Sequence, residues 1–284
     1  RAALGAFGSS TAISGTTLVV GAIGEAKDAT GANPFGGAGA AYFFEGTTTP
    51  PDYTITTTGN VLTITDMSGN GETLEISENG SNIRFNVTGR TYSINGGSPV
   101  AFNTTPADVP LSDISSIIVN TANGNDIINM RVFTANLPSL TINGGTGDDK
   151  VTLFGDITFA ANANLDLDLQ NDDAVPGVDE VDIVSNANIK LTGTGTATVK
   201  VSKNVRILSG GSLETVDGNL LVEANHQSTP TSGNFDGVSS SGLLQSTGSG
   251  SVTVKGKGGD AAALEQYGVR VIIGQIKGNT VNVV

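Results

Sequence analysis

Cysteine and tryptophan are absent from the 284 residues, and histidine occurs once, as His226. Without cysteine the chain cannot form disulfides, so a secreted protein of this sequence needs another stabilising device, such as the backbone ladders of long β-sheets. A zinc site built from cysteine and histidine ligands is excluded by the same counts. A Ser-His-Asp triad would have to use His226, which leaves a strand in the polar sequence Ala-Asn-His-Gln-Ser and is typical of a surface residue.

Positive charge and long apolar runs are also scarce. Lys and Arg number 14 against 27 Asp and Glu, so the net charge is −13. This charge argues against nucleic acid as a partner, because phosphate is repelled, and it suits either calcium or a simply solvated acidic surface. No stretch approaches the roughly 20 apolar residues of a membrane span. The chain begins at Arg1, which indicates that an upstream part was removed or that the chain is a piece of something longer.

Glycine is abundant, with 39 residues, and Thr, Ser, Asn and Val are frequent, a composition that favours strands and turns over helices. The stretch Ser115 to Gly155 contains the same pattern twice, a strand of β-branched residues followed by a turn rich in Asn, Gly and Asp. Such strands recur about every 24 residues, within the range of solenoid repeats, with starts at Ile117, Leu140, Leu165, Ile189 and Leu213. The sequence therefore predicts an all-β fold that is predominantly a parallel β-helix or solenoid.

Composition shifts divide the chain into four parts. Residues 1–46 are small and apolar and predict a short β segment, and residues 47–52, with a Pro pair, predict a linker. Residues 53–110 carry short strands joined by Asn-Gly turns, which predicts a β meander or irregular first coils. Residues 111–284 predict the solenoid, with a protruding loop at Ser228 to Ser249, where Ser, Gly and Thr dominate.

The first part resembles one FG-GAP repeat over residues 7–44, since Phe7-Gly8 stands at the FG position and Gly21-Ala22 at the start of GAP. This resemblance implies a blade of the integrin-type β-propeller found in many bacterial surface proteins, and hence an exported protein. One blade cannot close a propeller, which needs at least four. Its strand edges are therefore expected to need a partner.

A second resemblance is carried by Gly144 to Thr152, which matches the nonapeptide G-G-x-G-x-D-x-U-x of RTX calcium-binding β-rolls. A degenerate version, Thr121 to Ile128, lies one coil earlier and contains Asp126, so stacked coils would bring Asp126 beside Asp149. The resemblance implies a Ca²⁺ site at Asp126, Asp148 and Asp149, and the alternative is that these residues cap turns. The acidic stretch 171–180 is a second calcium candidate or a solvated turn.

Sugar-cleaving β-helix enzymes are the enzymatic alternative, because they use pairs of Asp on one wall and Asp166 with Asp168 could imitate such a pair. These enzymes also need aromatic platforms for sugar rings. The chain has no Trp, 4 Tyr and 10 Phe, and many of these aromatic residues lie in apolar runs. We therefore expect no enzyme activity and no catalytic residue.

The function that we expect is that of an extracellular or cell-surface structural protein, which forms a head-to-tail filament with copies of itself by β-strand addition. The reason is that the chain ends on an apolar strand and begins with an orphan blade-like segment, so both ends leave strand edges open. The alternative is a fragment of a large adhesin that displays loops on a solenoid stalk to a receptor or to surface glycans. The expected subunit-interface residues are Leu18, Val19, Val20, Tyr42, Phe43, Phe44, Val269, Val271, Ile273, Val281 and Val283.

Overall fold

The computed structural model describes residues 6–14, 17–23, 39–45, 49–170, 177–262 and 265–284. These residues form strands joined by turns, and none of them lies in a helix. None of the described segments is therefore a helix long and apolar enough to span a membrane. The chain divides into two compact units, 1–50 and 51–284, and the division falls within the predicted linker 47–52.

The first unit contains a three-stranded antiparallel sheet in the order β1 (Ala6–Ser14), β2 (Thr17–Ile23), β3 (Ala40–Glu45). The two predicted apolar runs pair directly, with Val19 opposite Phe43 and Val20 opposite Tyr42. Only part of this surface is covered, because Val20 is 5% exposed whereas Phe43 is 70% exposed. The segment is thus a small sheet with one apolar side open.

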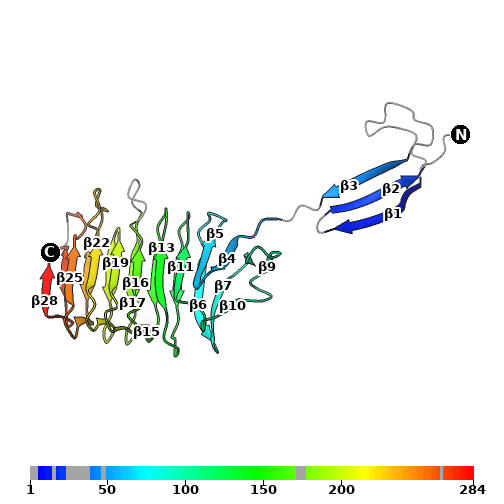
Figure 1. Cartoon of the computed structure of the whole chain (residues 1–284). Helices are drawn as coiled ribbons and strands as arrows, with labels where there is room; N and C mark the ends of the chain where they lie inside the picture. The colour runs from blue at the N-terminus through cyan, green and yellow to red at the C-terminus, as the bar shows by residue number, and fades with distance from the viewer. Residues whose placement is uncertain (1–5, 15–16, 24–38, 46–48, 171–176, 263–264) are drawn as a thin grey trace. The chain divides into compact units, whose positions relative to one another are not determined.

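The second unit is built from three sheets whose strands stack side by side along one axis (Figure 1). The eleven-stranded sheet has the order β28 (Thr280–Val283), β25 (Ser251–Gly256), β22 (Leu220–Ala224), β19 (Ala197–Val201), β16 (Leu165–Asp168), β13 (Ser139–Asn143), β11 (Ser116–Asn120), β5 (Val61–Asp66), β4 (Tyr53–Thr58), β8 (Thr91–Ile94), β9 (Val100–Ala101). The nine-stranded sheet has the order β10 (Ala107–Pro110), β7 (Asn82–Val87), β6 (Thr73–Asn79), β12 (Ile127–Met130), β14 (Lys150–Leu153), β17 (Glu180–Ile183), β20 (Asn204–Ile207), β23 (Val238–Ser240), β26 (Val269–Val271). The five-stranded sheet has the order β15 (Ile157–Ala161), β18 (Asn188–Thr192), β21 (Ser212–Thr215), β24 (Leu243–Ser246), β27 (Gln275–Lys277).

From β11 onward the neighbouring strands in each sheet are parallel, and the strands of the eleven-stranded sheet are in register, whereas β15 and β18 show one register shift. In the eleven-stranded sheet Ile117 pairs with Leu140, and Leu140 pairs with Leu165. In β11, β13 and β16 alternate residues are buried, because successive side chains of a strand point to opposite faces. The prediction of an all-β solenoid is confirmed: these coils bury their inward rows on the rows of the neighbouring coils.

The length of a coil is less regular than the sequence spacing indicated. Residues at equivalent positions of adjacent coils are 23 positions apart at Asp126 and Asp149 but 32 apart at Asn164 and Thr196. Ile189 and Leu213 pair with each other in the five-stranded sheet and not with the series of Ile117. The single period was therefore wrong, because strands of three sheets share one alternation pattern and the connections between strands differ in length from coil to coil.

The first coil is closed by antiparallel strands. Strands β5 and β6 belong to the parallel stack, where they pair with β11 and β12, and each folds back on an antiparallel partner, β4 and β7. The rings of Tyr53 and Tyr92 pack on Phe102 at centroid distances of 5.8 and 4.5 Å. Residues 53–110 therefore contain both parallel and antiparallel pairs, and this cap covers the core at the first coil.

The loop predicted at Ser228 to Ser249 is corrected by the structure. Its second half forms β23 and β24, which are regular members of the nine-stranded and five-stranded sheets. Phe235 in its first half is 8% exposed. The Ser, Gly and Thr content reflects small side chains packed where coils approach closely, as with Gly242, whose added Cβ would lie 2.1 Å from the Gly211 carbonyl oxygen.

Candidate functional site

The corner between β11 and β12 stacks on the corner between β13 and β14, and glycine makes this contact possible. A Cβ added at Gly145 would lie 1.8 Å from the carbonyl oxygen of Ala122, and one at Gly147 would lie 1.8 Å from that of Gly124. Both glycines have positive φ, +87° and +130°. The backbones are joined by hydrogen bonds, with the N–H of Thr146 donating to Ala122 O at 2.8 Å. The RTX-like glycines thus serve close coil stacking in this chain.

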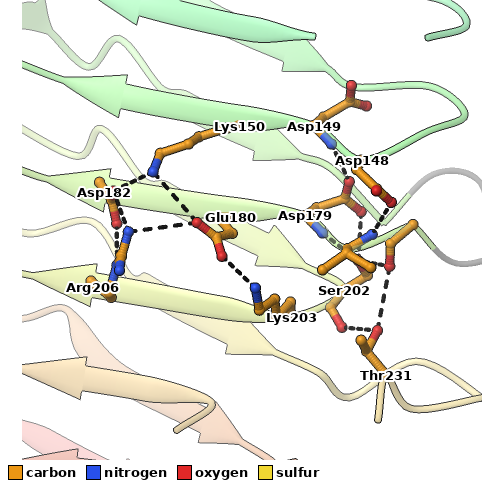
Figure 2. A network of polar contacts seen from close by, with 12 residues as sticks. Asp148, Asp149, Lys150, Asp179, Glu180, Asp182, Ser202, Lys203, Arg206 and Thr231 are labelled. Carbon is orange, nitrogen blue, oxygen red and sulfur yellow. Dashed lines mark hydrogen bonds and ion pairs between the residues drawn. The ribbon is translucent and has the colours of Figure 1, made fainter. Parts of the chain in front are cut away.

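A column of buried acidic side chains runs along this corner. Asp149 Oδ1 accepts the backbone N–H of Asp126 at 2.9 Å, and Asp179 Oδ1 accepts that of Asp149 at 2.7 Å. Ser202 Oγ accepts the N–H of Asp179 at 2.9 Å and lies 2.6 Å from Asp179 Oδ2, as Figure 2 shows. The steps between partners are 23, 30 and 23 positions, one coil each. Each side chain therefore satisfies a buried backbone donor of the neighbouring coil.

The three predicted metal ligands fall into two columns. Asp126 and Asp149 lie in adjacent coils, as the stacking argument predicted, and both are 1% exposed. Asp148 is exposed and belongs to an outer column, in which its N–H donates to Asn125 Oδ1 at 3.0 Å and its Oδ1 accepts the N–H of Val178 at 2.9 Å. Of the second calcium candidate, residues 171–176 lie outside the described residues.

At its first coil the column meets two further carboxylates. Asp126 Oδ1 accepts the backbone N–H of Glu72 at 2.9 Å, and one oxygen each of Asp66, Glu72 and Asp126 lies within 4.8 Å of the other two. We call these three residues the first-coil cluster. Tyr53 Oη donates to Glu72 Oε2 at 3.2 Å, and Arg90 Nη2 lies 2.6 Å from Glu72 Oε1. Sequence reasoning found Asp126 but missed Asp66 and Glu72.

The electrostatics of the first-coil cluster are those of crowded, desolvated anions. Burial raises the pKa of Asp126 to about 8, the N–H of Glu72 opposes this shift, and the carboxylates of Asp149, Glu72 and Asp66 add to it. Burial, followed by the charges of Asp66, Glu72 and Asp126, also raises the pKa of Tyr53 well above its ordinary value. The cluster therefore favours either neutralisation or a cation.

A separate ion-pair group covers the outer face of β14, β17 and β20 (Figure 2). Arg206 holds Asp182 through Nε–Oδ1 and Nη2–Oδ2 contacts of 2.6 and 2.7 Å, and Lys150 Nζ lies 2.9 Å from Asp182 Oδ2. Lys203 Nζ lies 2.6 Å from Glu180 Oε1. Burial raises the pKa of Asp182 and Glu180, but these cations outweigh it and the net pKa of each is lowered. The group ties three consecutive coils together.

The residues of the enzymatic alternative lie on the outside of the solenoid. Asp166 and Asp168 share the outward face of β16, where they pair in register with Thr198 and Lys200 of β19. Burial and the charge of Asp168 raise the pKa of Asp166, and Lys200 opposes the shift. His226 is exposed. These residues lie on different parts of the fold, in β16 and in the turn after β22.

The predicted interface residues of the last coil lie on β26 and β28 and, for Ile273, between β26 and β27. β26, β27 and β28 are the terminal strands of the nine-, five- and eleven-stranded sheets. Val271, Ile273, Val281 and Val283 are 44%, 73%, 43% and 50% exposed, and Val269 is half-buried. In the first unit Phe44 is 46% exposed, whereas Leu18, Val19 and Tyr42 are half-buried.

Comparison with known proteins finds one match. The model of the FG-GAP repeat matches residues 2–44, which agrees with the resemblance of residues 7–44 and covers only the first unit. FG-GAP repeats are typical of extracellular and cell-surface proteins. No curated protein and no solved structure matches the chain.

Proposed function

We propose that the chain is an extracellular structural protein whose copies assemble head to tail into a filament by β-strand addition. The observation that carries the proposal is the uncovered last coil. Val281 pairs with Val252 and Val283 with Val254, so β28 continues two inward rows whose preceding members, Val252 and Val254, are 0% exposed. Its own valines remain about half exposed because they end these rows. Open edges of this kind pair readily with an arriving strand.

The two ends of the solenoid differ, which gives the proposed assembly a direction. The first coil is covered by β4, β7 and the aromatic packing at Phe102, so another solenoid cannot stack there without removing this cap. The first unit, in contrast, presents sheet edges at β1 and β3 and exposed apolar side chains at Ile13 and Phe43. We therefore assign the first unit of one copy as the donor for the last coil of the next. Contacts between unlike surfaces that do not close form filaments.

Alternate positions of β28 provide a matched test. Light scattering and electron microscopy of the full chain, over a range of concentrations, should show particles that lengthen at constant width. Val281→Lys together with Val283→Lys should abolish this growth, because two charges would enter the inward row. Asn282→Lys changes the opposite face of the same strand and should still assemble. A wild-type chain that remains a single particle at all concentrations contradicts the filament.

The second candidate is a stalk of a larger surface adhesin. It is favoured by the FG-GAP match, since such repeats are typical of surface proteins, and by the same open edges, which further coils could continue. The largest loop predicted for display is not available in full, because β23 and β24 occupy its second half. Single rods that bind surface glycans in an array would favour this function over the filament.

A further inference from the structure

The first-coil cluster has the spacing of a calcium coordination shell. One oxygen each of Asp66, Glu72 and Asp126 lies within 4.8 Å of the other two. Calcium binds oxygen ligands at about 2.3–2.6 Å, so two ligands of one ion are at most about 5 Å apart. Three carboxylates from β5, the turn before β6 and the turn before β12 are thus brought to the distance that a single ion bridges.

Two of the cluster's oxygens are buried and lack a donor. Asp66 is 2% and Asp126 1% exposed, and the Oδ2 atoms of both have no hydrogen-bond partner in the part of the chain that the structure describes. Their Oδ1 atoms accept backbone N–H groups, from Ser68 at 2.7 Å and from Glu72 at 2.9 Å. The backbone therefore fixes the orientation of each carboxylate and leaves its second oxygen for another ligand.

The charge of the site calls for a divalent ion. Arg90 neutralises Glu72, with Nη2 2.6 Å from Oε1. No ion pair to Asp66 or Asp126 is found among the described residues. Keeping Asp66 and Asp126 both ionised in this desolvated site is therefore costly unless a cation joins them.

From this geometry we propose that Asp66, Glu72 and Asp126 bind a hard divalent cation, of which Ca²⁺ fits best. A surface pocket lined by Gly71, Gly89, Arg90 and Asn125 reaches Glu72, one of the three proposed ligands. The ion would link β5 of the first coil to the corner before β12 in the next coil. This site differs from the RTX-like one, because it uses neither Asp148 nor Asp149.

Thermal unfolding of the full chain tests the proposal. After removal of metal with a chelator, CaCl₂ should raise the Tm of the wild type in a saturable manner. Asp66→Asn combined with Asp126→Asn should melt above the wild type in chelator, because charge repulsion is relieved, and below it in calcium. Asp148→Asn, the control in the outer column, should keep the full calcium-dependent rise.

A terbium probe gives an independent readout. Tyr53 Oη lies 3.2 Å from Glu72 Oε2, and the chain has no Trp, so excitation of tyrosine should sensitise Tb³⁺ bound at the cluster. Tyr53→Phe should remove most of this emission, whereas Tyr267→Phe, at an exposed tyrosine, should leave it intact. The proposal is overturned if calcium leaves the wild-type Tm unchanged, if Asp148→Asn instead abolishes the rise, or if the emission does not depend on Tyr53.

Discussion

Replacement of Gly145 by Ala tests the stacking of the two corners directly. The added Cβ would lie 1.8, 2.6 and 3.0 Å from three backbone atoms of Ala122 in the neighbouring coil, so no side-chain rotation can relieve the contact. Overpacking of this kind costs about 1–3 kcal/mol. A non-glycine residue at the φ of +87° lowers the stability of the fold by about 1–2 kcal/mol more.

Gly96→Ala is the matched control, because Gly96 has a similar φ of +75° and nothing lies within 4 Å of its added Cβ. Both variants should be destabilised by the unfavourable φ, and only Gly145→Ala should also be destabilised by the clash with the neighbouring coil. We expect a difference of about 3 kcal/mol, near the upper end because the neighbours are backbone, and hence a Tm about 6–12 °C lower than that of the control. Thermal unfolding followed by circular dichroism measures both values. Equal losses in the two variants would refute the described stacking.

Two further predictions concern the polar columns. Asp149→Ala should lower the free energy of unfolding in urea by about 1.5–3 kcal/mol, because the buried N–H of Asp126 loses its acceptor. Asp148→Ala, at the exposed outer column, should lower it by less than about 1 kcal/mol. Equal losses in the two variants would contradict the structural role of the inner column. Asp182 and Glu180 have folded pKa values below their ordinary 3.8 and 4.5, so their stabilising contribution is present above those values and is lost as the pH falls through the lower folded ones. Arg206→Ala should therefore flatten the decline of Tm below about pH 4.5, and an unchanged decline would argue against this ion-pair group.

Much of the fold could be predicted because strand alternation is a local signal. Ile117, Leu140 and Leu165 are the first inward-facing residues of three predicted strands, and the structure pairs them in register as one inward row. The assignment failed at Ile189 and Leu213, since alternation reports that one face is buried but not which of three sheets buries it. Counting residues between strands could not reveal that later coils carry strands of a third sheet, or that the connections between strands differ in length.

The candidate site was only partly visible in the sequence. The nonapeptide motif predicted the corner between β13 and β14. It also predicted that Asp126 lies beside Asp149, because both are at equivalent positions of adjacent coils. Asp66 and Glu72 carry no repeat signal, since they come from the capped first coil, where β5 and β6 each turn back on an antiparallel strand. Glu72 meets Asp126 across 54 positions, a distance that only the stacking of β6 on β12 spans.

The coil-by-coil bonding of the inner column also bears on how such a chain can change in length. Asp149, Asp179 and Ser202 each accept a backbone N–H from the coil before, so duplication of a whole turn would reproduce this bonding pattern. A gene that gained one copy of the segment between Asp126 and Asp149 would encode a rod longer by about 4.8 Å, with every remaining neighbour relation intact. Rod length is thus free to vary in whole-turn steps, while the glycines that admit close approach must be copied with each step.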